Sequence, residues 1–264
     1  MSALVGYTGR VFLAGLHDFL TACKLLVDTA FWIVVAPLRG KGLRFRAATE
    51  QFVSVGYDSL PIVMLISLLL GAILAMQSAY QLESFGVGYL VPDLVAVAAM
   101  RELAPLMTAI LITGRSGSAF TAEIGTMKVS EEIDALEVMG LNPIKYLVVP
   151  KFIGTTLAVP LVTAVATFTM IIGGFLLSAL YLGQDATIYL ERSADSVTAK
   201  DFATGFVKSV FFAIVICLVG VYRGFEVEGG AEGVGKKTTS SVVTSIFLVI
   251  VVDVIFTYMF FSEG

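Results

Sequence analysis

Five long apolar stretches constrain the fold of this chain more than any other feature of its sequence. Each stretch is near or above the roughly 17 to 25 residues that a helix needs to cross a bilayer. With 57% hydrophobic and 14% charged residues, the 264-residue chain also has too little polar surface to coat a soluble domain. We therefore predict an all-α integral membrane protein, a single domain over residues 1–264 with five transmembrane helices. The predicted spans cover residues of about 60–80, 90–113, 152–182, 206–222 and 242–261.

Basic residues are distributed unevenly between the connections on the two sides of these spans. Thirteen lysines and arginines lie in residues 1–50, 113–152 and 222–238, whereas three lie in residues 183–208 and none in residues 81–100. Lysine and arginine gather on the cytoplasmic side of membrane proteins. We therefore predict a cytoplasmic N-terminus and, after five spans, a C-terminus on the opposite side.

The N-terminal segment of residues 1–50 is predicted to lie in the membrane interface. Over residues 10–36, polar side chains fall on one helical stripe of about 60 degrees, opposite an apolar face. A helix lying in the cytoplasmic interface explains this stripe, and the basic cluster from Arg39 to Arg46 would then meet lipid head groups. A true span with a polar seam is the alternative. The stripe consists of Arg10, His17, Thr21, Lys24 and Asp28.

Arg101 and Glu102 are ionisable residues inside the second predicted span, where a charge costs about 2.5 to 3.5 kcal/mol on insertion scales. Because adjacent helical residues do not face each other, each needs its own partner, and Asp253 in the last span is available to Arg101. The two residues either hold helices together as buried ion pairs or contact a lipid head group in a cavity. Three more residues, near the outer end of the first span, either line that cavity or form an interfacial belt: Gln77, Tyr80 and Phe85.

The polar connection of residues 114–151 contains a predicted amphipathic helix at about residues 130–140. Ser130 is its expected N-cap, and Gly140 ends it. Such a helix either packs under its own bundle or docks in the groove of another protein, and the residues alone do not decide between the two. Its apolar stripe is Ile133, Leu136 and Met139, and its acidic first turn is Glu131, Glu132 and Asp134.

Several kinds of chemical site are not supported by the sequence. Cys23 and Cys217 lie far apart in apolar surroundings, which predicts two buried thiols rather than a disulfide or a zinc site. The segment Gly230–Lys237 satisfies G-x-x-x-x-G-K, but it follows a span rather than a strand and ends on lysine where a phosphate loop has Ser or Thr. We interpret it as a cytoplasmic turn. We therefore expect no ATP hydrolysis, metal or cofactor on this chain.

Three motifs resemble the MlaE family of ABC permeases, which move lipids. They are REL-P at Arg101–Pro105, GRSGSAFTAEIGTMK at Gly114–Lys128 and EEIDALEVMGLNPIKYLVVPK at Glu131–Lys151. Looser similarity extends upstream through Ser59–Val63 and Gln77, and downstream through Gly233–Val243. The resemblance covers about four-fifths of the chain and implies a multi-pass permease of the bacterial inner membrane, with its C-terminus in the periplasm.

The resemblance also implies partners and roles. A second copy of the chain would form a homodimer around a lipid cavity, and Arg101 and Glu102 match the intramembrane pair of the family. A cytoplasmic ABC ATPase would bind ATP and Mg²⁺, a periplasmic MCE-domain protein would bind the lipid, and some systems add a STAS-domain protein; nucleic acid has no role. The predicted helix at about residues 130–140 would be the coupling helix to which the ATPase binds. Its contact residues would be Glu131, Glu132, Ile133, Asp134, Leu136, Glu137, Met139 and Gly140.

Two other classes of function remain open from the residues. An ion-coupled secondary transporter could use Arg101, Glu102 and Asp253 as a relay, although such folds usually show duplicated halves, and none is detectable here. A membrane scaffold without transport activity could use the same charges only to hold its helices together.

Overall fold

A computed structural model describes residues 20–35, 44–181 and 183–262 of the chain. All regular structure in these ranges is helical, and five helical segments are long and apolar enough to cross a membrane. This confirms the all-α membrane fold and the five predicted spans. The segments are Phe45–Ser84, Gly88–Val129, Ile144–Tyr181, Ala199–Phe225 and Gly230–Phe260.

Several of these segments consist of more than one helix. The first contains α2 (Phe45–Val55), a short 3-10 turn (Tyr57–Ser59) and α3 (Leu60–Ser84). The second contains a 3-10 turn (Gly88–Leu90), α4 (Val91–Ala98), α5 (Ala104–Ile112) and α6 (Ser118–Val129), joined by π-helical segments at Ala99–Leu103 and Thr113–Gly117. A third π-helical segment (Ile144–Val148) precedes α8 (Val149–Tyr181), and α10 (Ala199–Phe225) and α11 (Gly230–Ser262) follow. The connections hold α7 (Glu132–Val138) and α9 (Ala186–Ser196).

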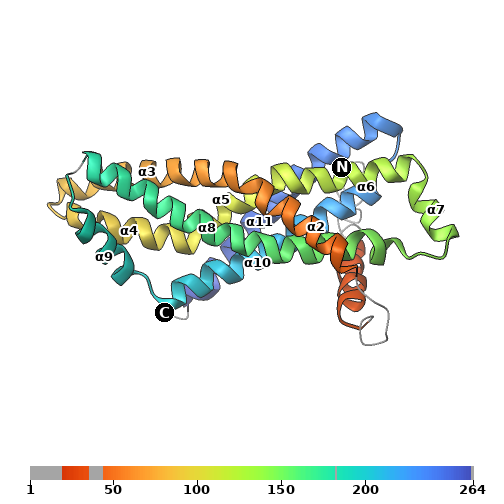
Figure 1. The fold of residues 1–264 in the computed structure, drawn as a ribbon, viewed down its shortest axis with the longest axis horizontal. Coiled ribbons are helices and arrows are strands. Elements are labelled where there is room, and N and C mark those ends of the chain that lie inside the picture. The colour runs from red at the N-terminus through yellow and green to blue at the C-terminus, as the bar shows by residue number, and fades with distance from the viewer. Residues whose placement is uncertain (1–19, 36–43, 182, 263–264) are drawn as a thin grey trace, which may run out of the picture.

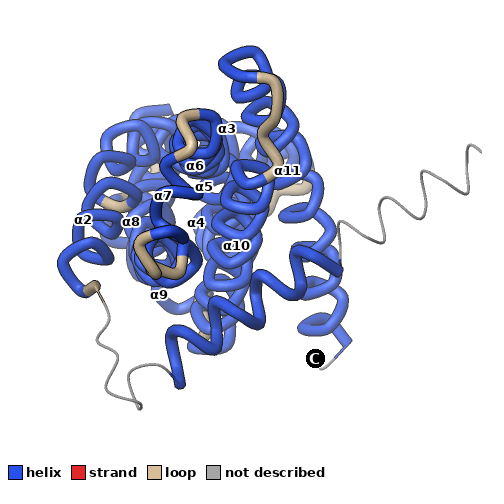
Figure 2. Tube along the Cα trace, turned by 90° about the vertical axis from the view of Figure 1, so that its right-hand side faces the viewer, coloured by secondary structure: helices blue, strands red, loops and turns tan. Residues whose placement is uncertain are grey.

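The helices form one elongated bundle with two distinct ends. In Figure 1, α7 and the turn between α10 and α11 lie at one end, and α9 and the turn between α3 and α4 lie at the other. The helix over residues 20–35 lies across the long axis of the bundle in both Figure 1 and Figure 2, as an interfacial helix would. Its Leu25 and Thr29 are buried. Residues 10–19 and 36 of the predicted interfacial helix, and Arg39 and Lys41 of the basic cluster, lie outside the described residues.

Glycines let α3 and α8 approach each other closely. A Cβ atom on Gly71 of α3 would lie 1.8 Å from the carbonyl oxygen of Met170 on α8, and one on Gly173 would lie 2.0 Å from that of Leu68. Small residues allow this backbone contact between membrane helices. Pro160 lies inside α8 without ending it, so residues 149–181 form the single long helix that the sequence predicts.

Two predictions about the connections were wrong. Ser130 is not the N-cap of the short helix, because its hydroxyl donates to the Thr126 carbonyl of α6 instead of accepting from α7. The second span also continues beyond residue 113, through α6 to Val129. The segment Gly230–Lys237, predicted as a cytoplasmic turn, is helical and begins α11. The chain reverses at Gly229 and Gly230, whose φ angles of 83° and 72° suit glycine.

Candidate functional site: an intramembrane charge network and an exposed short helix

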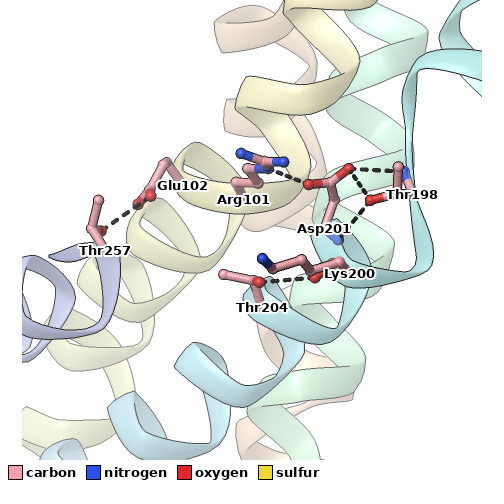
Figure 3. Close-up of polar contacts among 7 residues, drawn as sticks. All are labelled: Arg101, Glu102, Thr198, Lys200, Asp201, Thr204 and Thr257. Carbon is pink, nitrogen blue, oxygen red and sulfur yellow. Dashed lines mark hydrogen bonds and ion pairs between the residues drawn. The ribbon is translucent and has the colours of Figure 1, made fainter. Parts of the chain in front are cut away.

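Five ionisable residues from three spanning segments form an intramembrane charge network. Arg101 and Glu102 lie on the π-helical segment Ala99–Leu103, a type of irregularity that is frequent at functional sites. They diverge from this turn, Arg101 toward the start of α10 and Glu102 toward Thr257 of α11 (Figure 3). The members of the network are Arg101, Glu102, Asp201, Lys208 and Asp253.

Arg101 pairs with Asp201, which is fixed by the start of its own helix. The Nε atom of Arg101 donates to Oδ1 of Asp201, whose side chain is only 1% exposed. The other carboxylate oxygen of Asp201 accepts from the backbone N–H of Thr198 at 2.8 Å and from its hydroxyl at 2.7 Å (Figure 3). The two residues form a capping box at the N-terminus of α10. This carboxylate is therefore fully used by Arg101 and by the cap.

Lys208 is the centre of the second half of the network. Its side chain is 0% exposed, and its Nζ atom lies 2.5 Å from Oε2 of Glu102 and 2.9 Å from Oδ1 of Asp253. It also donates to the hydroxyl of Thr257 at 2.7 Å. One lysine on α10 thus joins the second and fifth spanning segments.

The geometry confirms one prediction and corrects another. Arg101 and Glu102 take separate partners, as their adjacency predicts. The partner of Arg101 is Asp201, however, and Asp253 pairs with Lys208 instead. The reason is the position of α10, which lies against the π-helical segment at Gly205, where a Cβ atom would come within 2.2 Å of the Met100 carbonyl oxygen.

Sequence reasoning missed Asp201 and Lys208. The connection predicted at residues 183–208 on the outer side includes Lys208, but this residue lies inside α10. Asp201, Gly205 and Lys208 recur at spacings of four and three, so they share one face of a helix. The Thr198-x-x-Asp201 pattern also marks a helix start. Together these signals could have identified an intramembrane lysine.

The three other predicted cavity residues do not join this network. Tyr80 of α3 and Phe85 just after it are each 80% exposed, and Gln77 is also exposed. The hydrogen bonds and ion pairs of Arg101 and Glu102 go to α10 and α11 instead. In the single chain, these three residues therefore form part of the outer surface of α3 and the turn after it.

The short helix α7 presents a mixed acidic and apolar surface. Ile133 and Leu136 are buried against the chain's own core, so the predicted apolar stripe faces inward at two of its three positions. Val138 and Met139 are 89% and 65% exposed, and Gly140, with φ of 74°, ends the helix as predicted. The exposed acidic residues of the predicted helix are Glu131, Glu132, Asp134 and Glu137.

Glu226, in the turn between α10 and α11, organises the same end of the bundle as α7. It accepts from Tyr222 at 2.8 Å, from Arg223 at 2.6 Å and from Lys237 at 3.0 Å. Burial by itself raises the pKa of this carboxyl, but the hydrogen bonds from Tyr222, Lys237 and Arg223 outweigh it and lower the pKa below its ordinary value. The group is therefore a carboxylate that ties the two last spans together.

Known proteins with similar sequences identify the family. The model of the family described as Permease MlaE matches residues 48–259. A probable ABC transporter permease protein of Rickettsia prowazekii is 30% identical over 251 residues, which cover 95% of this chain and 97% of that protein. One of Synechocystis is 34% identical over 217 residues, or 82% of each chain. The chloroplastic protein TRIGALACTOSYLDIACYLGLYCEROL 1 of Arabidopsis thaliana is 33% identical over 230 residues, 87% of this chain and 65% of that protein. The chain therefore belongs to the MlaE family of ABC transporter permeases, whose members work with a partner ATPase.

Proposed function

We propose that this chain moves phospholipid or a related lipid between the bacterial inner membrane and the outer envelope, powered by a separate cytoplasmic ATPase. The observation that carries the proposal is the charge network, because Arg101 and Glu102 keep 49% and 36% of their side chains exposed within spanning segments. Charges at this depth mark substrate pathways more often than lipid-facing surface. The Arabidopsis relative, which bears the name of a glycolipid, supports a lipid substrate.

The same proposal assigns the two ends of the bundle. The end with α7 faces the cytoplasm together with the N-terminus, and α9 and the C-terminus face the periplasm, as the unequal distribution of basic residues predicts. A second copy of the chain encloses the lipid cavity, which brings Gln77, Tyr80 and Phe85 to its wall. A periplasmic MCE-domain protein, and in some systems a STAS-domain protein, complete the transporter.

The ATPase docks on the exposed surface of α7. Four carboxylates surround the exposed Val138 and Met139, so the surface suits a groove with an apolar floor and a basic rim. Ile133 and Leu136 anchor the helix to the core from the opposite side. Differential affinity of the ATPase for two positions of α7 supplies the work of transport.

Reconstitution with the cognate ATPase in proteoliposomes tests both parts of the proposal. The assay measures ATP-dependent transfer of a labelled phospholipid and the recovery of the ATPase with the permease. Reversing charge at Glu132 and Glu137 together should lower both by about tenfold or more, the effect of like charges at an interface. The same reversal at Glu191, which is exposed on α9 at the other end, is the matched control and should change neither. Normal ATPase recovery in the double variant contradicts docking on α7.

A proton-driven alternative makes the opposite prediction in the same vesicles. If the network acts as an ion relay, a proton gradient moves lipid without the ATPase. If the chain is a scaffold, no lipid moves under either condition.

A further inference from the structure

The intramembrane charge network contains one more negative than positive charge. Its three carboxylates face two cations. Arg101 and Asp201 neutralise each other, and the capping box uses the other oxygen of Asp201. The excess negative charge therefore belongs to Glu102 and Asp253, which share the single cation Lys208.

Lys208 cannot compensate this excess further. Lys208 donates hydrogen bonds to Glu102 and Thr257 at 2.5 and 2.7 Å. Its Nζ atom also lies 2.9 Å from Oδ1 of Asp253, but that buried oxygen accepts no hydrogen bond among the described residues. Within the residues that the structure describes, no second cation contacts either carboxylate. Two carboxylates with one cation away from water are unfavourable, so the group is suited to one additional positive charge.

A cation can reach this group from the side of Glu102. The side chain of Lys208 is fully buried and that of Asp253 is 15% exposed, whereas that of Glu102 is 36% exposed. Arg101, the next residue along the chain, keeps 49% of its side chain exposed beside it. Arg101 diverges from Glu102 and is already paired with Asp201, so the partly exposed carboxylate of Glu102 is the group that can take a further cation, such as an ammonium group.

We propose that Glu102, with Asp253 behind it, binds the ammonium group of a zwitterionic lipid head group. The inference rests on the proposed function and makes it specific for a class of lipid. Ethanolamine and choline phospholipids place the positive charge of their ammonium group at Glu102 and Asp253, and their phosphate carries the same negative charge as that of phosphatidylglycerol. Phosphatidylglycerol has no ammonium group, so it leaves the excess negative charge uncompensated and binds more weakly.

The preference can be measured on the permease in complex with its ATPase. The complex is reconstituted in vesicles with equal parts of phosphatidylethanolamine and phosphatidylglycerol and purified again, and its bound lipids are quantified by mass spectrometry. The wild type should retain phosphatidylethanolamine over phosphatidylglycerol by about tenfold, the contribution of one charge-assisted hydrogen bond.

Two variants test whether the carboxylates cause this preference. Glu102→Gln should bring the ratio close to one, and Asp253→Asn should lower it. Each variant leaves Lys208 with one carboxylate, so the group becomes neutral and no buried charge is left alone. Glu191→Gln on α9, an exposed residue at the outer end, is the control and should keep the wild-type ratio.

Equal retention of the two lipids by the wild type overturns the inference, as does a preference that survives Glu102→Gln. Both results are expected if a proton, rather than an ammonium group, balances the two carboxylates. Equally tight binding of glycerophosphoethanolamine, which lacks acyl chains, also overturns it by identifying a soluble amine as the ligand. Failure of the proposed function is a separate result, in which neither lipid is transferred by ATP, whatever the ratio of bound lipids.

Discussion

Replacing Lys208 with methionine removes the one cation, among the residues that the structure describes, that pairs with two carboxylates inside the bundle. Methionine has a similar length and no charge, so the change tests charge rather than volume. Glu102 and Asp253 would then be like charges without a cationic partner among the described residues, and Glu102 would keep only its hydrogen bond from Thr257. We expect a clear loss of stability together with intact helical content.

The structure gives the size of this loss. Removing one partner of a buried ion pair costs about 3 to 5 kcal/mol, because the remaining charge is left uncompensated. Glu102 is 36% exposed, so water or a head group relieves part of its penalty, whereas Asp253 is only 15% exposed. We therefore expect the lower end of the range, about 3 kcal/mol.

The free energy of unfolding can be measured by titrating the purified permease from mild detergent into denaturing detergent. Lys200→Met is the matched control, because Lys200 lies on the same helix but is exposed. A triple variant that adds Glu102→Gln and Asp253→Asn to Lys208→Met removes all three charges and should recover at least half of the loss. A Lys208→Met variant as stable as wild type, or a triple variant less stable than Lys208→Met, would refute the reasoning.

Two further predictions concern packing and pH. Gly173→Leu should destabilise the bundle by about 3 kcal/mol, because its Cβ would lie 2.0 Å from a backbone carbonyl of α3 that cannot move aside. Gly235→Ala has open space around it and lies within α11, so in the same unfolding titration it should be neutral or stabilising by up to about 1 kcal/mol. Glu226 has a folded-state pKa below its ordinary 4.5, so it contributes stability that is complete above this pH and is lost as the pH falls below it. Unfolding midpoints measured from pH 7 downward should show this loss in wild type and a smaller one in Glu226→Gln.

The fold followed from the sequence where local chemistry decides it. Five apolar stretches predicted five spans, and the uncharged run before Tyr181 predicted one long helix, because length and hydropathy are sufficient for both. The adjacency of Arg101 and Glu102 likewise predicted separate partners. The identity of those partners depends on how α10 packs against the second span. This packing cannot be predicted from Lys208 or Asp201 alone.

The periodicity of the sequence also did not predict which face of α7 is exposed to solvent. Ile133 and Leu136 form an apolar stripe whether the stripe meets the chain's own core or another protein, and the structure assigns it to the core. The π-helical segments of the second and third spanning segments were not predicted, because apolar periodicity does not distinguish a single π turn from an α-helix. The ATPase-docking role of α7 stays a prediction, now on the surface of Val138, Met139 and the four carboxylates.

The second spanning segment connects the two parts of the candidate site mechanically. It runs as one helical segment from Gly88 to Val129, so Glu102 and the start of α7 are joined by about 40 Å of helix at 1.5 Å per residue. Lys128 donates to the Phe225 carbonyl at the end of α10, and Lys208 on the same α10 holds Glu102. Under the proposed function, a movement of α7 would be transmitted to the charge network along these two helices. Under the proposed function, any displacement of the second segment relative to α10 must change the contact between Glu102 and Lys208, which is where the head group is proposed to bind.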